Sequence, residues 1–343
     1  MSMPLGRALA WSLLVLAGAL VLSVAVGPVN IPLGVMWTVI AAKVGSSLLT
    51  IEGGATFATI LLDIRLPHAI LLLLTGAALA GSGAGYQALF RNPLADPYLI
   101  GVASGAGLGA VLAMSIRWPE SLGGLYLIPA AAFAGASLTV LVVYSLARIG
   151  GSLPTTTLIL AGVAVSSFAT SLTSFLMLRS NEQLRRATGW LMGGSLMSGW
   201  QPVVALLPYV LLGLAILLVS GHALNVLQFG EEQARQMGLP AERVKIWLIL
   251  AASLTTASAV AFSGIIGFVG LIVPHVVRML WGADYRRLIP LSIVSGGTVL
   301  LLADLLARTV LAPQVLPVGV VTALAGAPFF LWVLRRAKNQ GYW

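Results

Sequence analysis

Long uncharged apolar stretches, broken at intervals by charges, prolines and polar clusters, run through the whole chain. Several reach the length of about 20 residues that an α-helix needs to cross the hydrocarbon core of a bilayer. Gly and Pro lie inside these stretches, which membrane helices tolerate. Splitting the sequence at its charges and polar clusters predicts about ten crossings. They lie near 8–26, 66–90, 99–116, 127–147, 155–178, 202–220, 244–263, 267–280, 288–307 and 318–334.

The composition agrees with a helix bundle in lipid. Hydrophobic residues make up 59% of the 343, charged residues only 8%, and the mean hydropathy is +1.00. The net charge of +9 would suit a nucleic-acid-binding protein, but no basic run is longer than two residues, and none is interleaved with exposed aromatics. The absence of cysteine excludes disulfides, thiolate metal sites and cysteine nucleophiles. The expected fold class is an all-α integral membrane protein in which 1–343 form one transmembrane domain.

The apolar stretch that follows Met1–Gly6 has two interpretations, a cleaved signal peptide or a retained first span. The core of a signal peptide is roughly 7 to 15 residues long. Because the stretch here is longer, the sequence favours a retained helix.

Lys and Arg predict the orientation, because short cytoplasmic loops carry an excess of them. With the N-terminus in the cytoplasm, the inner segments hold twelve of the 19 Lys and Arg residues. An even number of spans then places both termini in the cytoplasm. The cations left on the outer side need a separate explanation; they are Lys43, Arg65, Arg117, Arg179, Arg185, Arg186 and Arg308.

A short polar island, Leu224–Pro240, separates the sixth and seventh spans on the cytoplasmic side. A glycine breaks it, acidic residues then suit the first turn of a helix, an arginine stands one turn later, and a glycine and a proline end it. These residues are Gly230, Glu231, Glu232, Arg235, Gly238 and Pro240. The pattern predicts two short helices.

Apolar side chains flank the charges of this island. They are Leu224, Val226, Leu227, Phe229, Met237 and Leu239. Such side chains would present a surface to another protein, but an interfacial helix lying on lipid headgroups has the same pattern. Periodicity alone leaves both interpretations open.

No motif in the chain indicates an active site. The sequence contains no phosphate-binding P-loop and no H-E-x-x-H motif, and His68, His222 and His275 are far apart in sequence. The sequence therefore predicts no metal site, and any ATP-driven step requires a separate subunit.

Two prolines mark a turn after the second span. Pro93 and Pro97 cannot continue a helix and disfavour helical backbone in the residue before each. Asn92 and Asp96 can satisfy exposed backbone groups and cap the next helix. Small residues that let helices approach closely then follow; they are Gly101, Ser104, Gly105 and Gly109. We expect a structural turn followed by helix packing, to which any role in transport would be additional.

A proline also interrupts the short span near 267–280. Pro274 is expected to turn or break this helix, as in helices that line a transport path. His275 is expected to be a structural hydrogen-bonding residue rather than a proton relay, because no partner histidine or carboxylate stands at helical spacing. Asp304, near the outer end of the ninth span, is expected to pair with Arg308 four residues on.

Three long motifs carry a resemblance to a known family. "RLPHAILLLLTGAALAGSGAGYQALFRNPLADPYLIGV", "GFVGLIVPHVVRMLWGADYRRLIP" and "ADLLARTVLAPQVLPVGVVTALAGAPFFLW" resemble segments of the FecCD family of bacterial ABC-importer permeases, whose members carry cobalamin, haem and iron-siderophores. The resemblance covers nearly the whole chain from Leu66 to Trp332. Within the family it is strongest to the cobalamin permeases.

The resemblance implies a homodimer of ten-helix subunits in the bacterial inner membrane, with a central path at the dimer axis. It also implies two cytoplasmic ATPase subunits, which bind ATP and Mg²⁺, and a periplasmic or lipid-anchored binding protein. This chain itself is expected to bind no cofactor. In the family, the stretch between the sixth and seventh helices forms coupling helices that sit in a cleft of the ATPase. The residues that occupy this place here are Leu224, Leu227, Phe229, Gly230, Glu231, Glu232, Arg235 and Gly238.

The resemblance also implies a role for some outer cations. Arginines at the positions of Arg65 and Arg308 in cobalamin permeases meet acidic residues on the binding protein. The family motif R-L-P-R reads "RLPH" here, so His68 replaces one docking cation and could make docking pH-sensitive. The alternative is that these arginines pair with Asp63, Asp304 or lipid headgroups.

The fifth span resembles the path-lining helix of the family. Its wall would be mildly polar and uncharged, and its candidate residues are Thr155, Ser166, Ser167, Thr170, Ser174 and Met177. Arg179, Arg185 and Arg186 follow at the outer mouth, where they could attract an anionic ligand or help to dock the binding protein. "WLMGG" at Trp190–Gly194 resembles a segment of cobalamin permeases and favours a corrinoid.

The sequence thus predicts the non-catalytic permease subunit of an ABC importer for a metal-chelate nutrient. An ion-coupled secondary transporter is the alternative, although it would need intramembrane acids or histidines placed to bind the coupling ion. A membrane-embedded enzyme is disfavoured, because the chain shows no clustered nucleophile, base or metal ligands.

Overall fold

The computed structural model describes residues 4–27, 34, 36, 38–39, 54–116, 124–150, 152–178, 181–194 and 197–339. Within these ranges the chain is helical throughout, apart from turns and a single β-bridge between Ile149 and Ser152. The expected all-α fold is confirmed.

Helices account for the predicted spans one by one. In chain order they are α1 (Leu5–Ala25), α3 (Gly54–Ala58), η1 (Thr59–Arg65), α4 (Leu66–Leu89), η2 (Pro97–Ile100), α5 (Val102–Ser115), α6 (Gly124–Ala147), α7 (Thr155–Met177), α8 (Asn181–Leu191), α9 (Gln201–Val219), α10 (Gly221–Leu227), α11 (Glu231–Gln236), α12 (Ala241–Ser263), α13 (Val269–Trp281), α14 (Tyr285–Thr309) and α15 (Val318–Asn339). Among the described residues, seven helices are long and apolar enough to cross a membrane, and α5, α13 and Val318–Val333 of α15 are shorter apolar helices. Each predicted crossing therefore coincides with one helix.

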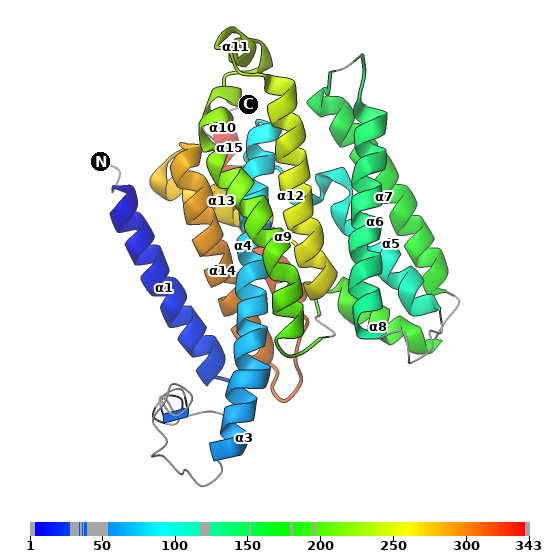
Figure 1. The fold of residues 1–343 in the computed structure, drawn as a ribbon, viewed down its shortest axis with the longest axis vertical. Helices are drawn as coiled ribbons and strands as arrows, with labels where there is room; N and C mark the ends of the chain where they lie inside the picture. Colours follow the sequence, from blue (N-terminus) through cyan, green and yellow to red (C-terminus); the bar gives the residue numbers. More distant parts are fainter. Residues whose placement is uncertain are drawn as a thin grey trace.

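α4 lies at the centre of the bundle (Figure 1). It packs against α14, α12, α13 and α9 and is buried along most of its length. α5, α6 and α7 form one flank, and α1 lies against α14 on the opposite flank. The start of α1 and the end of α15 lie toward the end of the bundle that carries α11, whereas α3 and α8 lie at the other end (Figure 1).

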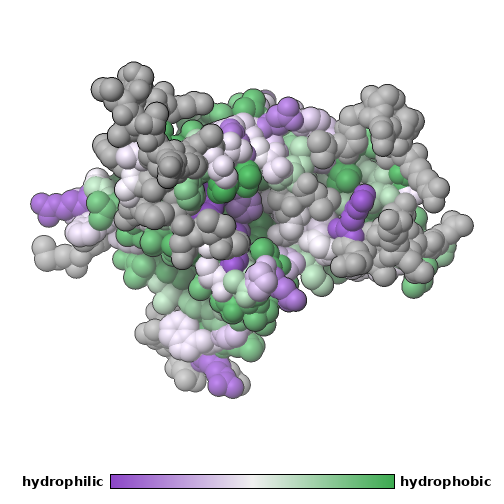
Figure 2. All heavy atoms as spheres, turned by 90° about the horizontal axis from the view of Figure 1, so that it is seen from below, coloured by the Kyte–Doolittle hydropathy of each residue, from purple (hydrophilic) through white to green (hydrophobic). Residues whose placement is uncertain are grey.

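Small residues allow the central helices to approach closely. A Cβ added to Gly76 of α4 would overlap the carbonyl oxygen of Gly296 on α14, and one on Gly105 of α5 would overlap that of Gly135 on α6. The predicted close packing around Gly105 is therefore confirmed. Many large apolar side chains face outward, as expected for helices surrounded by lipid, while others fill the core between the helices. Figure 2 shows apolar residues over much of the described surface seen from below, with only scattered hydrophilic ones.

The predicted turn after the second span is confirmed. The Asn92 carboxamide oxygen accepts a hydrogen bond from the Leu94 amide at 2.9 Å, and the Asp96 carboxylate accepts one from the Tyr98 amide at 2.8 Å. Asp96 caps the short η2 rather than α5, which begins after Gly101 in a left-handed conformation.

Pro274 was expected to be a turn residue, and this prediction is wrong. It lies inside α13, which runs from Val269 to Trp281. The break in the chain comes earlier, where Phe268 has a φ of 69°. An interior proline removes one helical hydrogen bond and bends a membrane helix without necessarily ending it. α6, α9, α14 and α15 each carry an interior proline as well.

Candidate functional site

The polar island forms two short helices at one end of the bundle (Figure 1). α10 ends at Leu227, and α11 covers Glu231–Gln236 with both glutamates in its first turn. Gly230 between them has a φ of 108°, and Gly238 after α11 has a φ of 82°. Only glycine adopts these backbone angles without strain. The predicted break, second helix and stop are all confirmed.

Burial divides the apolar side chains of the island into two groups. Leu224 and Leu227 are only 0% and 4% exposed, because α10 packs against α14 and α4. Their expected contact with a partner protein is therefore wrong for these two residues, which fasten α10 to its own bundle. Phe229 and Met237 are 68% and 56% exposed and leave an apolar surface beside α11.

The charges of α11 are bound to the start of α12 rather than to each other. Glu231 accepts from the Lys245 ammonium at 2.9 Å, and an Arg235 guanidinium nitrogen lies 3.0 Å from the Glu242 carboxylate. The i+4 neighbours Glu231 and Arg235 therefore have separate partners. Glu232 remains exposed on the outside of the helix.

Lys245 is the buried centre of this arrangement. Its side chain is 2% exposed, and its ammonium also lies 3.0 Å from the Glu242 carboxylate. A third contact, at 2.8 Å, joins it to the carbonyl oxygen of Leu153, between α6 and α7. From the sequence, Lys245 was only one of the twelve cations expected on the cytoplasmic side. Glu242, three residues before Lys245, was the feature of the sequence that indicated an ion pair at this position.

A second polar clamp holds α10 to the start of α14. The Asn225 carboxamide donates to the Asp284 carboxylate at 2.6 Å and accepts from the Tyr285 amide at 2.8 Å. Asp284 caps α14 and accepts two hydrogen bonds from the Arg286 guanidinium, at 3.2 and 3.1 Å. Chiefly because of Arg286, with help from Asn225, the pKa of Asp284 is lowered to about 2. None of these residues was singled out from the sequence.

The three expected docking residues come together at the opposite end of α14. Arg308 donates to Asp304 at 2.7 Å, and the His68 imidazole lies 3.1 Å from the other oxygen of that carboxylate. Arg65 donates to the carbonyl oxygens of Val24 and Ala25, each at 3.0 Å. Arg308 also donates to the carbonyl and hydroxyl oxygens of Ser23. We call this group, Ser23, Val24, Ala25, Arg65, His68, Asp304 and Arg308, the ion cluster.

Burial limits what the ion cluster can offer to a partner. Arg65 is 8% exposed, and the side chains of Arg308 and Asp304 are 12% and 7% exposed, whereas that of His68 is 33% exposed. Both guanidinium groups satisfy carbonyls at the C-terminal end of α1, where a helix carries partial negative charge. The predicted pairing of Arg308 with Asp304 is confirmed. The arginines are turned inward, and His68 is the member of the cluster that reaches the surface.

The candidate path helix α7 has one open face. Ser167, Thr170 and Ser174 are exposed on it, while Thr155, Ser166 and Met177 are partly buried. The Ser167 and Ser174 hydroxyls donate to carbonyls of their own helix at 2.9 and 3.0 Å. The described exposed residues of α7 therefore combine uncharged hydroxyl groups with large apolar side chains such as Val163 and Phe168, which are 54% and 70% exposed.

The outer-mouth candidates are described only in part. Arg186 is exposed on α8, whereas Arg179 and the side chain of Arg185 lie outside the described residues. Trp190 at the end of α8 is 2% exposed, and its carbonyl oxygen is in close contact with Gly264. The "WLMGG" segment therefore begins with an internal packing residue.

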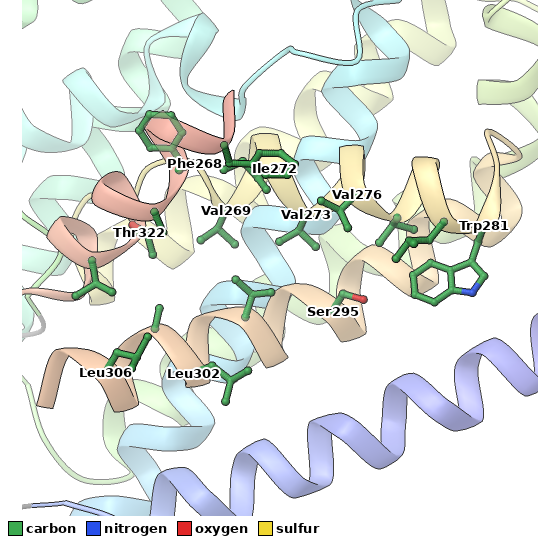
Figure 3. A pocket seen from close by; sticks show the side chains of 18 residues that line it. Phe268, Val269, Ile272, Val273, Val276, Trp281, Ser295, Leu302, Leu306 and Thr322 are labelled. Atoms are coloured by element: carbon green, nitrogen blue, oxygen red, sulfur yellow. The ribbon is translucent and has the colours of Figure 1, made fainter. Parts of the chain in front are cut away.

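An apolar cavity of about 440 Å³ opens between α13, α14 and α15 (Figure 3). Val273 and Val276 on α13 face Leu302 on α14 across it. Ser295 and Thr322 add hydroxyl groups and Trp281 an indole N–H to its lining, and no lining residue is titratable. This cavity can take apolar groups but offers no ionic or catalytic chemistry.

The comparison with known proteins gives the family. The model of the FecCD transport family matches residues 13–336. The chain belongs to the FecCD transport family. This permease is therefore a multi-pass membrane protein of a transport family, in agreement with its apolar helices.

Individual relatives of this FecCD permease cover nearly all of it. The "Cobalamin import system permease protein BtuC" of Halobacterium salinarum is 42% identical over 96% of this chain and 96% of its own. The "Hemin transport system permease protein HmuU" of Yersinia pestis is 40% identical over 81% of this chain and 84% of its own. A solved structure, described as an inward-facing conformation of a metal-chelate type ABC transporter, has a TM-score of 0.79 and 30% identity, covering 97% of this chain and 99% of that one. The FecCD permease shares that fold.

Proposed function

We propose that this FecCD permease imports a corrinoid as the membrane subunit of an ABC importer, in two copies with two ATPase subunits and a substrate-binding protein. The similarity to the cobalamin permease over 96% of both chains carries the proposal. The open face of α7 supports it, because neutral hydroxyl groups can pass a large ligand without binding it tightly. In this proposal the face lines a path between the two copies, and this chain performs no chemistry itself.

α11 is the proposed contact of the ATPase. Its exposed residues are all polar, namely Glu232, Gln233, Arg235 and Gln236, while Ala234 faces the bundle. An interfacial helix on lipid would need a continuous apolar face, which these six residues do not form. Phe229 beside it is a single exposed aromatic of the kind that anchors protein interfaces. These observations support protein docking over lipid binding. In this proposal, the end of the bundle that carries α11 faces the cytoplasm.

Transport then proceeds by alternating access. ATP closes the ATPase pair, α11 moves with it, and the α7 helices exchange an inward-open for an outward-open arrangement. ATP can shift this equilibrium only if α11 contacts the ATPase differently in the two states.

The binding protein is proposed to dock at the end of the bundle that carries the ion cluster. His68 would contact it directly, because its side chain is one-third exposed. Arg65 and Arg308 would support this contact without touching the partner, since they bind carbonyl oxygens at the C-terminal end of α1. An acidic patch on the binding protein would suit a surface with these cations beneath it.

Haem is the second candidate cargo. It is supported by the 40% identity to the hemin permease and by the exposed Arg186, which could attract a propionate. An ion-coupled transporter finds little support, because the Asp304 carboxylate is engaged by both Arg308 and His68.

The test is uptake into proteoliposomes that contain the permease, its ATPase and its binding protein. We expect ATP-dependent accumulation of radiolabelled cyanocobalamin, with haem and a ferric siderophore at background. Haem uptake at an equal or higher rate would replace the corrinoid assignment. Accumulation driven by a proton or sodium gradient without the ATPase would overturn the importer mechanism itself.

A further inference from the structure

Lys245 is buried where membrane proteins rarely place a cation. It lies on the second turn of α12, with its side chain 2% exposed. A buried ammonium is costly unless each of its three donors finds an acceptor. Here it donates hydrogen bonds to Glu231 and to the Leu153 carbonyl, and the Glu242 carboxylate lies 3.0 Å away as a second ion-pair partner.

These three acceptors belong to different segments. Glu231 is the first residue of α11, Glu242 lies in the first turn of α12, and Leu153 precedes α7. α11 has only six residues, too few for a stable helix without tertiary contacts. Its position therefore depends on a few attachments, of which the buried ammonium is one.

The attachment at Leu153 leads directly into α7. Pro154 follows it as the N-cap residue, with a φ of −65°, and α7 begins at Thr155. On the other side, Ile149 and Ser152 exchange two backbone hydrogen bonds, at 3.0 and 2.9 Å, which close the turn. The Leu153 side chain is itself buried at 3%. The carbonyl therefore lies directly before the first turn of α7, next to a hydrogen-bonded turn.

We propose that Lys245 is the positioning residue that links α11 to α7. The proposal rests on the proposed function, in which α11 receives the movement of the ATPase. When α11 moves, the Glu231 carboxylate moves with it, and the ammonium transmits that displacement to the Leu153 carbonyl. The Glu231 carboxylate and the Leu153 carbonyl cannot bind each other directly, because both are hydrogen-bond acceptors. A donor between them is required.

The experiment uses the assembled transporter in vesicles of phosphatidylethanolamine and phosphatidylglycerol. Because the chain has no cysteine, Gln236→Cys and Thr156→Cys at exposed positions of α11 and α7 accept spin labels without background. Pulsed electron–electron distance measurements need no cargo. We expect a narrow label-to-label distribution in this background and a clearly broadened one when Lys245→Met is added. Because Gln236 belongs to the proposed ATPase contact, transport is measured without the two cysteine substitutions. There Lys245→Met should lower the cyanocobalamin transported per ATP hydrolysed at least tenfold, with ATPase activity within twofold.

Three further variants separate linkage from simple stability. Arg243→Met removes an exposed cation two residues away and should leave distances and transport unchanged. Lys245→Arg should restore at least a third of the transport per ATP. Lys245→Met with Glu231→Gln removes the stranded carboxylate, so it should recover thermal stability without recovering coupling. This double variant also serves if Lys245→Met alone fails to assemble.

Two results would overturn the proposal. One is a narrow distance distribution with near-normal transport per ATP in Lys245→Met, and the other is recovery of coupling together with stability in the double variant. The proposed function fails differently, if Phe229→Glu leaves ATPase binding intact. In that case the distances measured in the permease alone still decide whether Lys245 holds α11 to α7.

Discussion

The Arg308 guanidinium donates to the Asp304 carboxylate at 2.7 Å, one turn apart on α14. The same arginine reaches the carbonyl and hydroxyl oxygens of Ser23 at the end of α1. One ion pair therefore joins two helices that are far apart in sequence. His68 on α4 adds a third through the other carboxylate oxygen.

Asp304→Asn is expected to loosen this end of the bundle. The substitution keeps the shape of the side chain but leaves Arg308 without its counter-charge in a buried position. Breaking a buried ion pair by removing one partner costs about 3–5 kcal/mol. We expect a loss of about 3 kcal/mol in the free energy of unfolding, measured in detergent by chemical denaturation.

Asp63→Asn is the matched control for that experiment, because Asp63 is exposed near the same end of the bundle. Its effect should stay within about 0.5 kcal/mol. Equal losses in the two variants would show that the Asp304 pair adds no specific stability.

His68→Arg tests the docking surface. It restores the cation that the family motif carries at this position, on the exposed member of the ion cluster. We expect the affinity for the binding protein to rise about fivefold, equivalent to about 1 kcal/mol, at low ionic strength. The gain should vanish near 1 M salt, where the Debye length is about 3 Å. Surface plasmon resonance can measure this affinity. A gain in affinity that does not depend on salt, or no gain at all, would show that His68 lies outside the contact.

The helices could be predicted from the sequence because lipid imposes a simple rule. Every backbone group in the bilayer must be satisfied within its own helix, so each span appears as an uninterrupted apolar stretch. The same rule explains why Pro274 was misjudged, since a membrane helix can continue through a proline that would end a helix in water. Gly230 and Gly238 were predictable for a local reason, because their left-handed backbone angles require glycine.

The contacts of the charged residues could not be predicted in the same way. Arg235 stands one turn after Glu231 in the sequence, but its guanidinium contacts Glu242, seven residues on. Lys245 meets a carbonyl 92 positions away, at Leu153. Such pairs depend on how separate helices pack, which a one-dimensional pattern does not contain. For the same reason the burial of Leu224 could not be predicted, because it results from the packing of α10 against α14 and α4.

Phe229→Ala should weaken ATPase binding without damaging the fold. The side chain is 68% exposed, so its loss should change the free energy of unfolding by less than about 0.5 kcal/mol. An aromatic anchor at an interface contributes about 1–3 kcal/mol, which corresponds to a change in Kd of about 5- to 150-fold. Titration of the purified ATPase onto the permease in nanodiscs measures it.

Leu224→Ala should have the opposite profile. Leu224 is fully buried on the inner face of α10. Its truncation therefore leaves a cavity that costs about 2–5 kcal/mol of stability. The molecules that remain folded should bind the ATPase with an unchanged Kd. If Leu224→Ala weakened ATPase binding while Phe229→Ala did not, the assignment of the exposed surface would be reversed.

Asp284 should make the junction of α10 and α14 sensitive to acid. Hydrogen bonds from Arg286 and Asn225 lower its pKa to about 2, below the value of about 3.9 in an unfolded chain. The carboxylate form therefore stabilises the folded state fully above pH of about 4, and this stabilisation is lost as the pH falls toward about 2.

Asp284→Asn removes the charge at every pH. We expect this variant to be less stable than the wild type at pH 7 and pH 5. The difference in stability between the two proteins should shrink between pH 4 and pH 3. Thermal unfolding in a zwitterionic detergent follows this difference, and exposed Glu232→Gln serves as the control. A difference that stayed constant down to pH 3 would mean that Asp284 acts through its shape, not through its charge.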